Sequence, residues 1–258
     1  MYATALRRTV CAALVSVVAA CGSPASWGAV EDAAGERQRV ECRGTAGPAV
    51  VLVHGIGDRA GSASFQKVLE KLPDERRVCR YDRPGAGDSP PPKGGGRDAA
   101  QLDRELDAVV RMADPDRPVL LVGHSFGSYP VLHYVAGHRE RVAGVVLVDA
   151  VDPRLGLLQA LGVASWSQVS MAKENLDLPA VQEQTASSVD RSAAVLGGLP
   201  MVVVRRERGT TAAWLAAQER LAGLSRRGRL VVAAGSGHEV PTDNPAAVVD
   251  AINQLGAG

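Results

Sequence analysis

The chain has almost no net charge. Its 29 Lys and Arg residues are balanced by 28 Asp and Glu residues, which leaves a formal charge of +1. Proteins that bind nucleic acid or another polyanion usually carry a basic excess, so this balance argues against such a partner. With 258 residues, 46% of them hydrophobic, the chain can bury the core of one large α/β domain or two small ones. These numbers exclude a disordered protein.

The sequence also lacks the motifs of nucleotide and metal binding. Residues 82–87 are rich in glycine, but no P-loop lysine follows them and no Gly-x-Gly-x-x-Gly precedes a helix. The cysteines and histidines are not spaced like the ligands of a zinc site. We therefore expect no cofactor and no metal, and we interpret residues 82–89 as a structural loop.

The apolar run at residues 10–20 is too short to cross a bilayer comfortably. It follows two arginines and precedes small residues, which is the pattern of an export signal. We predict that residues 1–30 are a signal peptide and that residues 31–258 form the folded domain. Because Val18-Ala-Ala-Cys-Gly22 resembles a bacterial lipobox, Cys21 is a candidate for lipidation, which would anchor the protein at the cell surface. Ordinary cleavage nearby, followed by secretion, is the alternative.

Four cysteines occur in the chain, and only two belong to the predicted domain. Cys11 and Cys21 lie in the predicted signal, which leaves Cys42 and Cys79. Because exported domains fold in an oxidising compartment, we expect these two to form a disulfide that ties two strands together. Two buried free thiols are the alternative, which export disfavours.

Strand and helix patterns alternate along the rest of the chain. Short apolar runs predict strands at 38–43, 49–53, 77–81, 119–122, 142–148, 201–204 and 230–233. Helical spacing predicts helices at 65–72, 98–112, 126–136, 212–224 and 245–255. Residues 153–198 lose the strand pattern and are expected to form inserted helices. Since the central strands are apolar on both faces, we predict an α/β fold with a mostly parallel sheet covered by helices on both sides.

The stretch Gly123-His-Ser-Phe-Gly127 leaves the strand at 119–122 and enters a helix. A Gly-x-Ser-x-Gly sequence in this setting is typical of a nucleophile elbow, where the serine occupies a strained turn and projects from the sheet edge. Gly123 and Gly127 then leave room for the crossing backbone. The flanking strand and helix favour Ser125 as a nucleophile over the alternative of a structural turn.

A serine hydroxyl needs a base to remove its proton, and His238 is the best candidate. It lies in a loop after the last predicted strand, where it can reach over the sheet edge. Four other histidines are less well placed, because they lie in the elbow, in the helix behind it or in another turn: His54, His124, His133 and His138.

The turn His54-Gly-Ile-Gly57 follows the first core strand. Its glycines let the backbone N–H of Ile56 face the serine, so we assign an oxyanion hole to the N–H groups of Ile56 and Phe126. A plain turn between strand and helix is the alternative.

In this order, the motifs resemble those of the α/β-hydrolase superfamily: His54-Gly55, residues 82–89, residues 123–127 and Ser236-Gly-His238. The resemblance covers about residues 38–255. It implies a sheet of about eight strands with a helical cap inserted after the sixth, at about residues 153–198. It also makes the second and fourth strands neighbours, which would place Cys42 beside Cys79.

The acid of the triad departs from the usual pattern of that superfamily. Most members carry it after the seventh strand, where this chain has Gly209 at the expected position and only Glu207 nearby. A minority carry it at the end of the sixth strand, where this chain has Asp149. We assign Asp149 to orient His238. Glu207 and Asp152 are the alternative acids, and in that case Asp149 would have only a structural role at the end of the strand.

These residues indicate an exported serine hydrolase that cleaves carboxylic ester or related acyl bonds of a small-molecule substrate. Ser125 would attack the carbonyl, His238 would transfer the proton and Asp149 would orient the histidine. A cofactor-free lyase or peroxidase on the same triad, or a non-catalytic binding protein, is the alternative, because one fold hosts many activities.

Overall fold

The computed structural model describes residues 26–32, 35–57, 63–169, 173–191 and 196–256. Within these ranges the chain forms one eight-stranded sheet in the order β1-β2-β4-β3-β5-β6-β7-β8. Strands β3 to β8 are parallel, while β1 and β2 run antiparallel at one edge. The strands are β1 (Ser26–Glu31), β2 (Arg37–Arg43), β3 (Ala46–Val53), β4 (Arg76–Asp82), β5 (Val119–His124), β6 (Val142–Val148), β7 (Met201–Arg206) and β8 (Gly228–Ala233).

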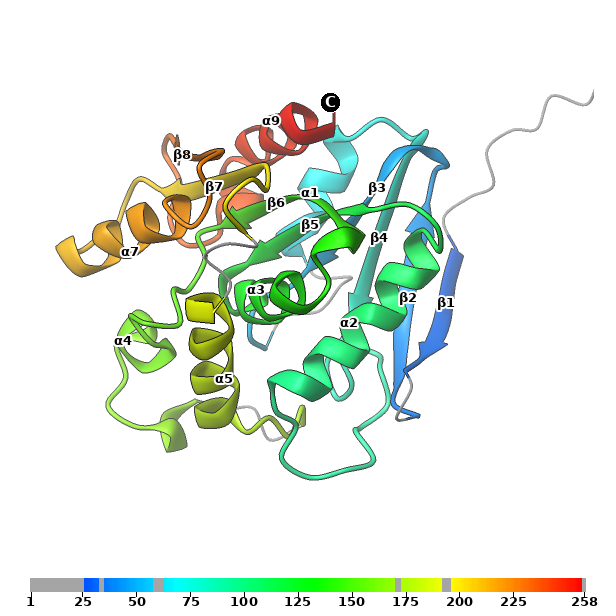
Figure 1. The fold of residues 1–258 in the computed structure, drawn as a ribbon, viewed down its shortest axis with the longest axis horizontal. Helices are drawn as coiled ribbons and strands as arrows, with labels where there is room; N and C mark the ends of the chain where they lie inside the picture. The colour runs from blue at the N-terminus through cyan, green and yellow to red at the C-terminus, as the bar shows by residue number, and fades with distance from the viewer. Residues whose placement is uncertain (1–25, 33–34, 58–62, 170–172, 192–195, 257–258) are drawn as a thin grey trace, which may run out of the picture.

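Helices cover both faces of this sheet (Figure 1). They are α1 (Ala63–Lys71), α2 (Ala99–Ala113), α3 (Ser128–Gly137), α4 (Leu157–Leu161), α5 (Leu178–Arg191), α7 (Ala212–Ala222), α8 (Val240–Asp243) and α9 (Pro245–Gly256), with short 3₁₀ turns η1 (Ser125–Gly127), η2 (Arg139–Arg141) and η3 (Trp166–Gln168). None of the described helices is long and apolar enough to span a membrane.

Strand β3 shows why the sheet carries two helical layers. Its residues Val51 and Val53 pack into the core cluster shared with α2 and α3, whereas Val50 and Leu52 pack into the cluster shared with α1 and α9. Side chains alternate between the faces of a strand, so a continuous apolar run can bury both faces. Each fully buried Val or Leu contributes about 1.5–3 kcal/mol to the stability of the fold. The predicted mostly parallel sheet with helices on both faces is confirmed.

Strand β1 is the element that we did not predict. It pairs antiparallel with β2, from Ser26 opposite Cys42 to Glu31 opposite Arg37. The boundary placed between residues 30 and 31 therefore falls inside a strand of the sheet. Its sequence, Ser-Trp-Gly-Ala-Val-Glu, has no clear alternation, and the strand depends on the open edge of β2 for its pairing. Cys21 lies outside the described residues, and signal cleavage and lipidation stay predictions.

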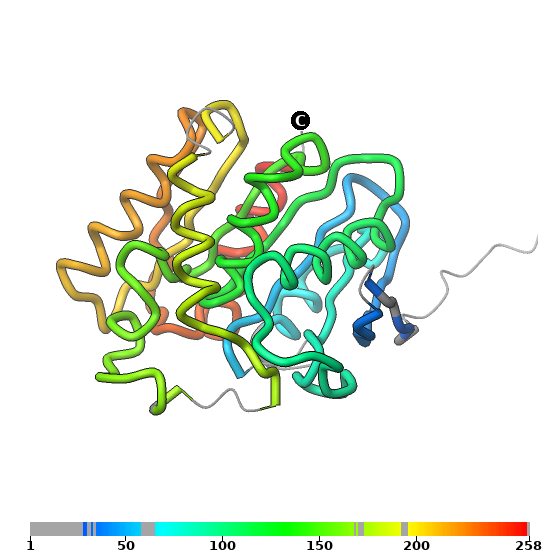
Figure 2. The backbone as a smooth tube through the Cα atoms, turned by 60° about the horizontal axis from the view of Figure 1, so that its bottom comes forward, coloured from blue at the N-terminus to red at the C-terminus, as the bar shows by residue number. Residues whose placement is uncertain are grey.

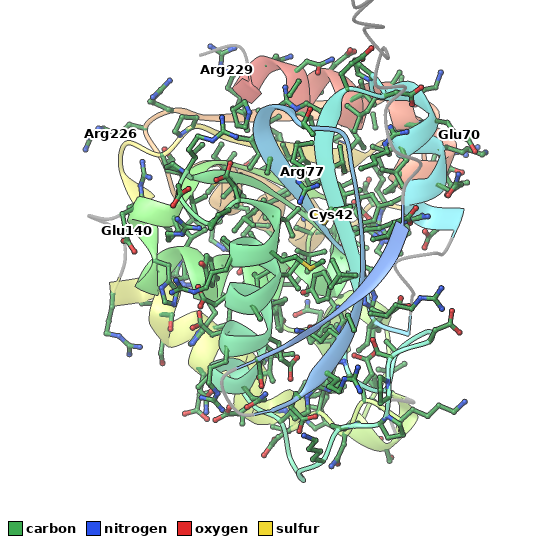
Figure 3. All side chains as sticks on the ribbon, turned by 90° about the vertical axis from the view of Figure 1, so that its right-hand side faces the viewer. Cys42, Glu70, Arg77, Glu140, Arg226 and Arg229 are labelled. Atoms are coloured by element: carbon green, nitrogen blue, oxygen red, sulfur yellow. A yellow bond between two sulfur atoms is a disulfide. The ribbon has the colours of Figure 1, made fainter. Side chains whose placement is uncertain are left out.

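The predicted disulfide between Cys42 and Cys79 is confirmed. The two residues are partners in the antiparallel pairing of β2 with β4, and they lie 37 positions apart in the chain. Figure 3 shows Cys42 on the strands at this edge of the sheet. The bond ties the antiparallel edge to the parallel body of the sheet.

The chain between β6 and β7 leaves the sheet and forms α4, η3 and α5, the region predicted as a cap. Helix α5 packs against α3 and α2, as Figures 1 and 2 show. One arm of this region runs along the loop after β4, where Leu176 forms a β-bridge with Arg97. Gly85 in that loop comes so close that a Cβ on it would lie 1.8 Å from the backbone oxygen of Lys173.

Candidate active site

The predicted elbow is a sharp, strained turn at the end of β5. Ser125 has a φ of 53°, in the left-handed region that serine rarely adopts. A Cβ on Gly123 would lie 2.8 Å from the backbone oxygen of Gly127, and a Cβ on Gly127 would lie 2.3 Å from that of Val53. Only glycine fits at these two positions, as the sequence predicted. The Ser125 side chain sits at the carboxyl end of the strand and is nearly buried, with 3% of its surface exposed.

Hydrogen bonds connect the elbow to the loop that follows β6. The Ser128 hydroxyl lies within hydrogen-bond distance of the backbone oxygens of Ser125 and Val151, at 2.8 and 2.9 Å. The Val151 N–H donates to the Ser125 oxygen at 3.3 Å. These contacts fix the position of the β6 loop relative to Ser125.

Asp149 and His238 meet at this edge of the sheet. Asp149 ends β6 with a φ of 39° and is fully buried, and its Oδ2 accepts a hydrogen bond from His238 Nδ1 at 2.7 Å. A proton held on Nδ1 leaves Nε2 as the acceptor of the imidazole. That tautomer is the one in which a histidine can remove a proton from a serine.

Arg206, at the end of β7, also holds Asp149. Its backbone N–H donates to Oδ1 at 3.1 Å and its guanidinium donates to Oδ2 at 3.0 Å. The guanidinium lies over the Trp214 ring of α7, 4.3 Å from the centroid. The carboxylate therefore receives donors on both oxygens, which fixes its orientation toward His238. The sequence offered no signal for this role, since an arginine at a strand end is usually solvated.

The two alternative acids point elsewhere. Glu207 is exposed, and its carboxylate accepts a hydrogen bond from the Gly235 N–H at 2.7 Å. Asp152 accepts from the Arg220 guanidinium at 2.9 Å and from the Arg154 N–H at 2.8 Å. Among the described contacts of these two carboxylates, none is to His238. The geometry thus favours Asp149 as its partner.

His238 also lies beside the elbow, although its imidazole and the Ser125 hydroxyl are not hydrogen-bonded to each other in the described contacts. Its ring centroid is 5.1 Å from that of His124, the residue before Ser125. His124 Nε2 is 3.1 Å from the His238 backbone oxygen. In enzymes without substrate, catalytic hydrogen bonds are often long or misaligned. The serine and histidine therefore lie at the same edge of the sheet.

Ile56 and Phe126 border one apolar cluster next to the elbow. Phe126 is buried in that cluster and Ile56 packs against it. His54, the first residue of the turn that contains Ile56, is fully buried. Burial first and the nearby Arg83 second hold the pKa of its imidazole well below 6.5. His54 is therefore neutral, and its Nδ1 lies 2.9 Å from the Gly55 oxygen. It contributes to the turn rather than to proton transfer.

The described residues include one group that could present ligands to a metal ion. Ligand atoms of His124, His238 and Glu239 lie within 4.8 Å of one another. Hydrogen bonds to Asp149 and to a backbone carbonyl already orient the two imidazoles, and Glu239 is exposed. This arrangement fits a general base and its neighbour better than a closed set of metal ligands.

Comparison with known proteins defines the class to which this fold and site belong. Residues 48–199 match the model of the α/β hydrolase fold family. The chain therefore belongs to that family, as the motifs predicted.

Individual relatives are distant. The chain is 24% identical over 211 residues to the uncharacterized protein YqjL of Bacillus subtilis. The aligned residues cover 79% of this chain and 81% of YqjL. It is 32% identical over 113 residues to the lipase LipV of Mycobacterium tuberculosis, covering 43% of this chain and 40% of LipV. Other curated relatives are also matched over less than half of their own length, from 18% to 48%.

Solved structures agree on the fold. The esterase RhEst1 from Rhodococcus sp. ECU1013 is 20% identical, with a TM-score of 0.68 over 90% of this chain and 99% of that chain. A thermophilic esterase from Thermogutta terrifontis is 21% identical, with a TM-score of 0.65 over 89% of this chain and 97% of that chain. These neighbours share the fold of the α/β hydrolase family.

Proposed function

We propose that the protein is an exported serine hydrolase that cleaves carboxylic ester or related acyl bonds of small molecules. The observation that carries this proposal is the 2.7 Å hydrogen bond between His238 and the buried Asp149, at the same sheet edge as the strained Ser125. A nucleophile, a base and an acid that orients the base are the groups that acyl transfer requires.

In the proposed mechanism, Ser125 Oγ attacks the substrate carbonyl carbon while His238 Nε2 takes the hydroxyl proton. Asp149 stabilises the imidazolium that forms. The backbone N–H groups of Ile56 and Phe126 donate to the developing oxyanion. Collapse of the tetrahedral intermediate expels the alcohol, which receives the proton from His238, and a water molecule activated by the same base then releases the acid.

An activity-based fluorophosphonate probe tests this proposal directly. We expect the protein to become labelled, Ser125→Ala to stay unlabelled, and labelling to be blocked by prior incubation with a p-nitrophenyl ester. Labelling without ester turnover would favour a lyase or peroxidase on the same triad. A folded wild type that takes up no label would favour a non-catalytic binding protein.

Substrate class follows from a series of p-nitrophenyl esters of increasing chain length. The apolar cluster around Phe126 includes Leu157 from α4 and Val181 from α5, so the cap forms part of the wall next to the serine. We expect esters with short acyl chains to be turned over, and a preference for long chains would instead indicate a lipase.

The export component of the proposal rests on the signal-like first thirty residues and on the disulfide between Cys42 and Cys79. Lipidation at Cys21 predicts incorporation of an alkyne-labelled fatty acid by the full chain. The Cys21→Ala chain should incorporate none. Equal labelling of both chains would contradict lipidation at Cys21, and an unlabelled full chain would leave a secreted protein without a lipid anchor.

A further inference from the structure

The largest fully buried side chain of the described residues is a charged one, Arg83. It belongs to the loop after β4, which the sequence indicated only as structural. Its guanidinium donates to the backbone oxygen of His54 at 2.8 Å and to that of Gly55 at 2.8 Å. A buried arginine therefore donates hydrogen bonds to two successive carbonyls of the turn that follows β3.

The second of these carbonyls belongs to the peptide whose N–H group is the proposed oxyanion donor. The Gly55 oxygen and the Ile56 N–H are the two ends of one planar amide. The Arg83 backbone N–H donates to His54 Nε2 at 3.4 Å, so the neutral imidazole carries its proton on Nδ1. His54 Nδ1 then donates to the same Gly55 oxygen at 2.9 Å, and this oxygen has two donors. These bonds fix the plane of the amide and polarise it, which strengthens the N–H as a donor by about 10–30% per bond.

Arg83 also contacts the residue of the other proposed donor. Its guanidinium carbon lies 5.3 Å from the ring centroid of Phe126. A carboxylate from the cap, Glu174, accepts from Arg83 Nε at 2.8 Å and is itself 3% exposed. Although burial opposes the charge, Glu174 raises the pKa of Arg83 above its ordinary value, so the guanidinium stays charged.

We propose that Arg83 is a positioning residue of the oxyanion hole, which aligns and polarises the Gly55–Ile56 amide while Glu174 of the cap holds the guanidinium in place. This inference rests on the proposed function, because it assigns a purpose to a donor of that reaction. It makes the cap a support of the catalytic machinery through one buried ion pair.

The test compares Arg83→Gln with Arg80→Gln, a matched control. Arg80 is also a buried arginine in an ion pair, with Glu41 of β2, and its guanidinium donates to the Gln66 side chain of α1 at 3.1 Å. Both variants lose a buried ion pair. Arg83→Gln also loses the hydrogen bonds to the His54 and Gly55 oxygens.

Three quantities are measured for each folded variant: kcat per active site titrated with the fluorophosphonate, KM, and Ki for an aryl trifluoromethyl ketone. This ketone forms a tetrahedral adduct with the serine and so reports oxyanion binding. Removal of a whole oxyanion donor costs about 10²–10³ in kcat, and weakening one should cost less. We expect Arg83→Gln to lower kcat about 10- to 100-fold, to change KM less than about twofold and to raise Ki by the same factor as it lowers kcat.

Arg80→Gln should also lower the melting temperature but leave kcat and Ki within about threefold of wild type. Equal effects of the two variants on kcat and Ki would overturn the inference, because Arg83 would then act only through stability. An unchanged kcat in Arg83→Gln with normal labelling of Ser125 would also overturn it and leave the proposed function standing. If the wild type takes up no label, both proposals fail.

Arg83→Lys keeps the test decisive if the glutamine variant does not fold. A lysine retains the charge beside Glu174, but its single ammonium cannot reproduce the planar fork that bonds both carbonyls. The inference predicts kcat about 3- to 10-fold below wild type with a parallel rise in Ki. Wild-type values of both would contradict it.

Discussion

Replacement of Asp149 by asparagine removes the charge of this residue and nearly keeps its shape. The carboxylate accepts three hydrogen bonds: from His238 Nδ1, from the Arg206 N–H and from the Arg206 guanidinium. Asparagine offers one oxygen and one NH₂ group, so it cannot accept from all of these donors. If its NH₂ faces the imidazole, the histidine must place its proton on Nε2, and the base toward Ser125 is lost.

The magnitude follows from that tautomer change. In serine proteases the same substitution lowers kcat about 10⁴-fold, which corresponds to about 5.5 kcal/mol of transition-state stabilisation. We expect Asp149→Asn to approach this loss with a KM within about threefold of wild type. The matched control is Glu207→Gln, which should stay within about twofold in kcat, because that carboxylate is exposed and bonds the Gly235 N–H.

The assay is turnover of p-nitrophenyl acetate, normalised to folded protein by near-UV circular dichroism. Normalisation to protein is needed here because a variant with a disabled base also reacts slowly with the fluorophosphonate. The assignment of Asp149 is refuted if Glu207→Gln is the more damaged enzyme. It is also refuted if Asp149→Asn retains more than about a tenth of wild-type kcat.

Two further predictions concern stability. The Cys42–Cys79 bond closes a loop of 37 positions, so the double Cys→Ala variant should lose about 4 kcal/mol of unfolding free energy in urea; an unchanged midpoint would contradict this. Burial and Arg83 depress the pKa of His54 in the folded protein, so below about pH 6.5 the unfolded chain binds one proton more than the folded chain. The free energy of unfolding therefore decreases as the pH is lowered, by up to about 1.4 kcal/mol per pH unit. His54→Asn, which cannot titrate, should show a shallower loss between pH 7.5 and 5.5, and equal slopes would show that His54 is not buried as a neutral group.

The sequence predicted those features that depend on neighbouring residues. The elbow was recognisable because the two glycines that make room for the turn lie two positions on either side of Ser125. The parallel strands were recognisable because burial of both faces leaves continuous apolar runs, as in β3. The resemblance to the α/β-hydrolase superfamily indicated the end of β6 as a place for the acid, and Asp149 there lies at the same sheet edge as Ser125 because β5 and β6 are parallel neighbours.

Contacts between distant segments were not predictable in the same way. Arg206 reaches Asp149 only because β6 and β7 are neighbours in the sheet, and nothing in its local sequence distinguishes it from a solvated arginine. The local sequence gives no signal for the role of Arg83, because its partners, the turn after β3 and Glu174 of the cap, lie 28 and 91 positions away. Strand β1 was missed because its pairing comes from the exposed edge of β2 and not from its own pattern.

The close approach at Gly85 has a consequence for engineering. A methyl group there would meet the Lys173 backbone oxygen at 1.8 Å, and the residue has a φ of 79° that disfavours any side chain. Backbone on both sides leaves no flexible atom to move aside. Alanine at this one position would therefore push the cap arm away from the loop after β4 while leaving the side chains of Ser125, His238 and Asp149 unchanged.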